Sequence, residues 1–90
     1  MTSGRQPFES LPLAQQAGIM CNDDRFQKFA AIRSGFPGGQ FCASAAAEYL
    51  RSCCKIDSRR ALEADATAQA NFARLRTDFD AWRGRIAAQR

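Results

Sequence analysis

An apolar seam near the C-terminus constrains the fold of this 90-residue chain more than any other feature. Its members are spaced 4, 3, 4, 3 and 4 positions apart: Ala68, Phe72, Leu75, Phe79, Trp82 and Ile86. This is the a/d pattern of a helix that packs along one side. A helix from Ala66 to Ala88 would be roughly 35 Å long. The sequence therefore predicts a long C-terminal helix with one buried face.

A second helix is predicted from about Asp23 to Gly35. Asn22 is a good N-cap, and Asp23 and Asp24 suit the positive end of the helix dipole. Residues at helical spacing give it one apolar face, formed by Phe26, Phe29, Ile32 and Phe36. Gly35 and the Pro37-Gly38-Gly39 run end the helix.

A third helix is predicted from about Gln40 to Cys54, and its apolar face comprises Cys42, Ala46, Tyr49, Leu50 and Cys53. After a break, Asp57 or Ser58 can cap a short helix from about Arg59 to Ala64, and Asp65 or Thr67 can cap the long one. We therefore predict an all-α fold, a small bundle of three to four helices. Its expected core is Phe29, Tyr49, Leu62, Phe72, Leu75, Phe79 and Trp82.

Residues 1–20 lack this periodicity, and Gly and Pro residues interrupt them. We predict a flexible N-terminal tail over residues 1–20 and a single helical bundle domain over residues 21–90. The periodic sequence begins just after Met20, which makes Met20 a candidate internal start.

The chain has four Cys and no His, so the commonest general base and metal ligand is missing. The Cys residues form no C-x-x-C pair, and adjacent Cys53 and Cys54 point about 100° apart on a helix. We predict buried thiols, no metal, no cofactor and no obligatory disulfide, with a zinc site as the alternative. Cys54 is expected to turn partly away from the core and to be the most reactive thiol.

The tight acidic pairs have structural explanations. Asp23 and Asp24 suit a helix N-terminus, while Asp78 and Asp80 lie four residues after Arg74 and Arg76 and predict i,i+4 ion pairs. No catalytic residue is predicted, and the protein is expected to be non-enzymatic.

The basic residues carry the functional prediction. Net charge is +4 and the pI is about 9.2, which fits a nucleic acid or an acidic protein surface as partner. Arg59 and Arg60 begin a short helix after a helix and a break, the order found in a helix-turn-helix. On the long helix, Arg76 and Arg83 flank the seam, and Arg74 and Arg85 lie on its far side. These six arginines are the candidate partner-binding residues, and a solvated, salt-bridged surface is the alternative.

Three signatures carry a resemblance: F-x-x-F from Phe26, C-x-I-x-S-R-x-x-L from Cys54, and A-x-x-x-F-x-x-L-x-x-x-F-x-x-W from Ala68. Through them the stretch from Phe26 to Trp82 resembles small helical proteins carried by phages and prophages. The resemblance implies a mobile-element product that tunes host recombination, transcription or defence.

Together these features predict a phage or mobile-element accessory factor that binds and modulates a host nucleic-acid-handling or defence complex. It would act as a regulator or as an inhibitor of the anti-CRISPR type, and direct contact with nucleic acid stays open. The alternative is a helical dimerisation or adaptor module that acts through the C-terminal helix, so a homodimer also stays open. No apolar run approaches the roughly 18 residues of a membrane span, and a cytoplasmic protein is expected.

Overall fold

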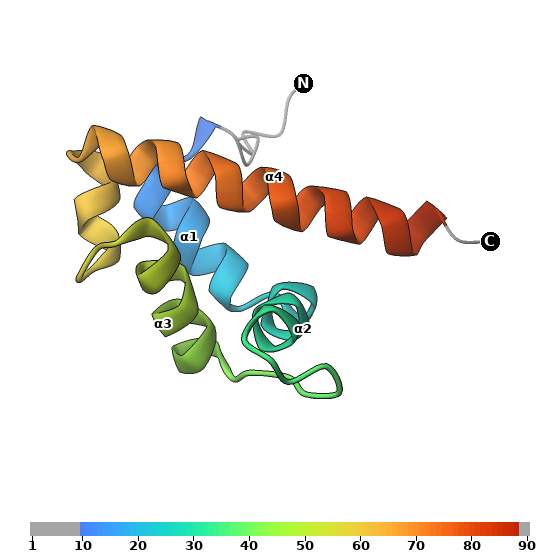
Figure 1. Ribbon diagram of the computed structural model, residues 1–90. Helices are drawn as coiled ribbons and strands as arrows, with labels where there is room; N and C mark the ends of the chain where they lie inside the picture. Colours follow the sequence, from blue (N-terminus) through green and yellow to red (C-terminus); the bar gives the residue numbers. More distant parts are fainter. Residues whose placement is uncertain (1–9, 89–90) are drawn as a thin grey trace, which may run out of the picture.

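The computed structural model describes residues 10–88, with side chains described through Gly84. In chain order the elements are α1 (Leu13–Cys21), α2 (Asp24–Arg33), α3 (Ala43–Cys54), the 3₁₀ helix η2 (Arg59–Glu63) and α4 (Ala66–Ala88). No strand occurs in this part of the chain, which confirms the all-α prediction. Figure 1 shows α4 running across one side of the bundle, with its C-terminal end projecting past the other helices.

The long helix begins and packs as its sequence predicts. Asp65 caps it, because its side-chain Oδ1 accepts hydrogen bonds from the backbone N–H groups of Thr67 and Ala68. Four seam residues are buried, namely Ala68, Phe72, Leu75 and Phe79. Trp82 is half-buried, and the Ile86 side chain lies outside the described part.

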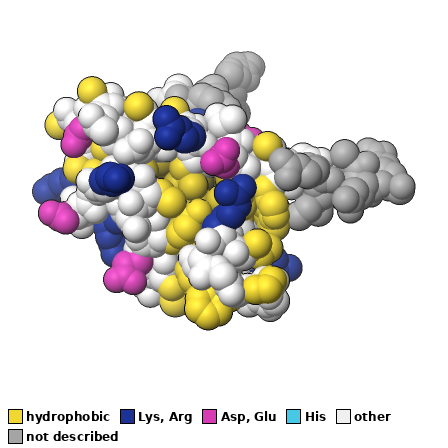
Figure 2. Space-filling view, in the orientation of Figure 1, with side chains coloured by type: hydrophobic (Ala, Val, Ile, Leu, Met, Phe, Trp, Pro, Cys, Tyr) yellow, Lys and Arg dark blue, Asp and Glu magenta, His cyan; other side chains and the backbone are white. Residues whose placement is uncertain are grey.

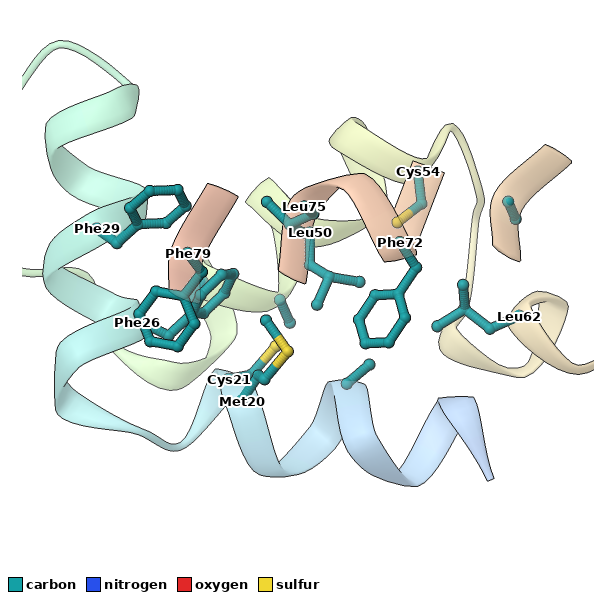
Figure 3. Packing of buried hydrophobic residues seen from close by; sticks show 14 residues of the cluster. Met20, Cys21, Phe26, Phe29, Leu50, Cys54, Leu62, Phe72, Leu75 and Phe79 are labelled. Atoms are coloured by element: carbon teal, nitrogen blue, oxygen red, sulfur yellow. The ribbon is translucent and has the colours of Figure 1, made fainter. Parts of the chain in front are cut away.

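The core is one cluster to which every helix contributes (Figure 3). At one end the Phe79 ring of α4 lies 5.2 Å from Phe26 and 5.4 Å from Phe29, both on α2. At the other end Phe72 and Leu62 lie between α1, α4 and η2 (Figure 3). Of the seven expected core residues, five are buried, and Tyr49 and Trp82 are half-buried against the cluster.

The N-terminal boundary needs a correction, because residues 13–20 belong to the bundle and not to a tail. They form most of α1, whose buried side consists of Gln16, Ala17, Met20 and Cys21. The N-cap residue Pro12 makes no side-chain cap. Instead, Glu63 of η2 accepts a 3.0 Å hydrogen bond from the Ala14 backbone N–H. Residues 1–9 lie outside the described part.

The second correction concerns the end of α2. The helix ends at Arg33, two residues earlier than predicted, and Gly35 then adopts a positive φ of 98°. Phe36 therefore leaves the helical period and is 58% exposed, and Ile32 is 37% exposed. Hydrophobic atoms reach the surface at the lower edge of Figure 2, near the connection between α2 and α3. The N-cap is Asp23, not Asn22, because the Asp23 side chain accepts from the Arg25 backbone N–H.

The thiol environments differ from the prediction. Cys54 faces the core at 1% exposure, and burial raises its pKa to about 11. Cys42 is exposed at the N-cap of α3, which begins three residues later than expected. A hydrogen bond with the Ser44 hydroxyl, followed by bonds from backbone N–H groups, lowers the pKa of Cys42. The expectation that Cys54 turns away from the core is wrong, because that side of α3 packs against the bundle.

A thiol reagent should therefore modify Cys42 first and Cys54 last in the folded protein. A thiolate is the attacking species, so both access and a lowered pKa favour Cys42. Peptide mass spectrometry of a labelling time course at near-neutral pH measures the order. Cys42→Ser should abolish the fastest phase. Labelling of Cys54 at the rate of Cys42 in native buffer would contradict the packing of α3.

Metal sites and membrane spans are both absent from the described residues. No group of three or more His, Cys, Asp or Glu residues there is placed to hold a metal ion. No described helix is long and apolar enough to cross a membrane. The prediction of a metal-free protein remains one that elemental analysis must test.

Candidate functional site

Arginine side chains gather along the outer side of α1, the helix that the sequence did not reveal. Gln15 and Ile19 of α1 and its C-cap residue Asn22 form an exposed stripe. They are spaced i, i+4 and i+7 and so share one side of the helix. One flank of α1, with Ala14 and Gly18, faces η2. The opposite flank, with Gln16 and Met20, faces α4.

On the η2 flank a shallow hollow of about 580 Å³ separates α1 from η2 and the end of α3. Its charged lining is Arg51, Arg59, Arg60 and a single carboxylate, Asp57. None of the three arginines forms an ion pair with a described carboxylate. Three positive charges held together against one negative charge favour an anionic ligand. We call Arg51, Arg59 and Arg60 the basic cluster.

Contacts with α1 fix the position of Arg59. The Nε atom of Arg59 lies beside Gly18, and a Cβ atom added at Gly18 would stand 3.9 Å from it. Burial raises the pKa of Cys21, and the nearby charges of Arg59 and Arg51 partly oppose that shift. Both guanidinium groups thus lie close to one buried sulfur atom, and Arg59 is half-buried.

On the α4 flank a second hollow of about 310 Å³ has an apolar floor and a charged rim. Met20 and Phe79 form the floor, and the exposed Ile19 lies at its edge. The rim carries Arg25, Arg76 and Arg83 together with Asp23 and Asp80.

Every arginine of this rim has a partner. Arg25 pairs with Asp23 at 2.8 Å, and Arg83 pairs with Asp80 at 2.7 Å. Arg76 Nη1 donates a 3.1 Å hydrogen bond to the buried amide oxygen of Gln16. The hydrogen bond from Arg25 holds the pKa of Asp23 below its usual value. These contacts hold the rim in place and leave it one net positive charge, three arginines against two aspartates.

The structure joins some predicted site residues and separates others. Arg59 and Arg60 line one hollow together with Arg51. Arg76 and Arg83 line the other together with Arg25. Arg51 and Arg25 carry no signal in the sequence, because their neighbours come from α1, η2 and α4. The adjacent arginines at 59 and 60 were the one signal that sequence offered for this surface.

The remaining predicted arginines lie apart. Arg74 is exposed, and its predicted ion pair with Asp78 does not form. The predicted pair of Arg76 with Asp80 is present at 4.0 Å. The Arg85 side chain lies outside the described part.

The helix-turn-helix interpretation does not fit the geometry. η2 is a five-residue 3₁₀ helix whose Leu62 is fully buried, and Arg59 at its start lies against α1. A recognition helix must leave its first turns free to enter a groove. η2 instead serves as a wall that holds arginines beside α1.

Comparison with protein-family models, with curated proteins and with solved structures finds no match to this chain. The function is therefore inferred from the geometry of the site, and the resemblance to phage-borne proteins stays a prediction.

Proposed function

We propose that this protein is a non-enzymatic binding protein that contacts nucleic-acid phosphates through Arg51, Arg59 and Arg60. One observation carries the proposal: these three guanidinium groups line one hollow and have no carboxylate ion-pair partner among the described residues. Guanidinium groups bind phosphate oxygens in bidentate fashion and remain charged at any physiological pH.

In this proposal the protein is an accessory factor of a phage or mobile element. It would bind and modulate a host nucleic-acid-handling or defence complex, as an inhibitor of the anti-CRISPR type or as a regulator. The basic cluster would supply the contact with the nucleic acid of that complex. The small bundle and the resemblance of Phe26–Trp82 to phage-borne proteins support this role.

A second candidate function is a helical adaptor or homodimer formed through α4. The projection of its C-terminal end past the bundle favours it (Figure 1), as does the half-buried ring of Trp82. Apolar helix pairing depends little on salt, whereas phosphate binding weakens steeply as salt rises. Salt dependence therefore separates the two functions.

The double substitution Arg59→Ala with Arg60→Ala should weaken nucleic-acid binding while the fold is retained. Each charge-assisted hydrogen bond lost costs about 1.5–3 kcal/mol. The logarithmic salt slope should become shallower by about one unit for each phosphate contact removed. Fluorescence anisotropy with labelled oligonucleotides at several salt concentrations measures both quantities, and circular dichroism checks the fold.

Arg74→Ala is the matched control, because it removes an exposed arginine without an ion pair from α4. It should leave affinity and salt slope nearly unchanged. If the double variant binds as the parent does at low and at physiological salt, the basic cluster is not the functional surface. A loss seen only with Arg74→Ala would move the site to the outer side of α4.

A further inference from the structure

We propose that α1 lies in the major groove of a B-form DNA duplex, with the phosphates of the two strands seated in the hollows on its flanks. This inference rests on the proposed phosphate contact of the basic cluster. It adds the kind of nucleic acid and the helix that approaches it.

The helix α1 forms a ridge with a hollow on each of its flanks. Ala14 borders the hollow toward η2. A further open hollow along the same flank is lined by Ala14, Gly18 and Arg59, and Met20 borders the hollow toward α4. Ile19 reaches both sides. In Figure 3 the outer side of α1 faces away from the packed core. A ridge with a depression on each side complements a groove with a phosphate backbone on each side.

The second step is the match of widths. An α-helix with its side chains is about 10–12 Å across, and the major groove of B-DNA is about 12 Å wide. Arg59 stands on one flank of α1, and Arg25, which lines the α4 hollow with Ile19 and Met20, stands on the other. Arginines on both flanks are thus placed to meet the phosphates of opposite strands.

The third step is charge. The η2 hollow carries three arginines against Asp57, which leaves two net positive charges. The α4 hollow carries three arginines against two aspartates, which leaves one. Both flanks therefore attract phosphate, and the η2 flank does so more strongly. On the α4 flank Arg25 is the most accessible cation, since its side chain is 61% exposed.

The fourth step is the chemistry of the exposed stripe. The Gln15 amide can bond adenine at N6 and N7, and the 46%-exposed Ile19 offers an apolar contact to a thymine methyl group. Asn22 Nδ2 donates to the Gly18 carbonyl at 3.0 Å, which leaves the Asn22 amide oxygen to accept a bond from a base. The described residues that line the hollows present no exposed aromatic ring on which single-strand bases would stack. The stripe therefore favours A·T pairs in a duplex.

Fluorescence anisotropy of the full chain with three labelled probes of one A·T-rich sequence tests the proposal. The probes are a DNA duplex, the single DNA strand and an RNA duplex. The DNA duplex should bind roughly tenfold tighter or more, because A-form RNA has a deep, narrow major groove that excludes a helix. Methyl green, a major-groove ligand, should compete with the protein, and netropsin, a minor-groove ligand, should compete far less.

Gln15→Glu supplies the matched variant. It changes one exposed amide to a carboxylate of the same shape near the start of α1, where a negative charge suits the helix dipole. Duplex affinity should fall roughly tenfold, because the variant loses a base contact and its carboxylate repels the DNA phosphates. Thr77→Glu adds the same charge on the exposed side of α4 and should change affinity by less than about threefold.

Equal binding of the three probes, tighter binding of the single strand, or equal effects of Gln15→Glu and Thr77→Glu would overturn the major-groove proposal. In those cases the proposed function survives if Arg59→Ala with Arg60→Ala still weakens binding. If no probe binds at low salt, both proposals fail.

Discussion

Replacing Phe79 by Ala should lower the free energy of unfolding by about 3–5 kcal/mol. The ring is 3% exposed and fills the space between α2 and α4, where it meets Phe26 edge-on and stacks with Trp82. It also carries the Arg83 guanidinium group, whose carbon lies 4.9 Å from the ring centroid. The substitution thus removes a ring, leaves a cavity and frees a rim arginine. A domain of this size has a total stability of only about 5–15 kcal/mol, so much of it would be lost.

Denaturant unfolding followed by the fluorescence of Trp82, the single tryptophan, measures this loss. Phe36→Ala is the matched control, because it removes the same ring from a site that is 58% exposed. The control should cost well under half as much, since little apolar surface is buried there. Equal unfolding midpoints for the two variants would mean that Phe79 faces solvent and that α4 does not pack on α2 as described.

The predictability of each helix follows from where its stabilising contacts come from. α4 is predictable because its seam repeats at a/d spacing and its cap, Asp65, is adjacent in sequence. α1 is not, because its buried side uses small or polar residues such as Ala17 and Gln16. Its N-terminal backbone partner, Glu63, lies 49 positions away. Hydrophobic periodicity does not detect a helix whose buried side consists largely of small or polar residues.

The candidate site also depends on contacts between distant parts of the chain. Arg59 and Arg60 are visible in the sequence as an adjacent pair, but Arg51 sits on a different helix and joins them only because α1 packs against both η2 and α3. Arg76 and Arg83 do flank the seam as predicted. Their partners, Gln16 and Asp80, give them a structural role in addition to any binding role.

A chain that begins at Met20 should fail to form the native bundle. It lacks residues 1–19, and with them the part of α1 that holds Gln16 and Ala17, which are 2% and 0% exposed. Loss of this segment uncovers Leu62 and Phe72 (Figure 3) and removes the partners of Glu63 and Arg76. We expect the free-energy cost of exposing this core surface to exceed the total stability of a small domain, which is roughly 5–15 kcal/mol.

Thermal unfolding monitored by circular dichroism gives the readout. The shortened chain should lose its cooperative transition. The fraction of the helical signal that it loses should be larger than the fraction of the chain that was removed. A chain that begins at Ser10 is the control, since it keeps every described helix, and it should still unfold cooperatively. If the chain starting at Met20 melts at the temperature of the full chain, α1 is dispensable and residue 20 is the domain boundary after all. Arg59 would then lose Gly18 as its neighbour without any cost to the fold, and the basic cluster would have to bind without the helix that it borders.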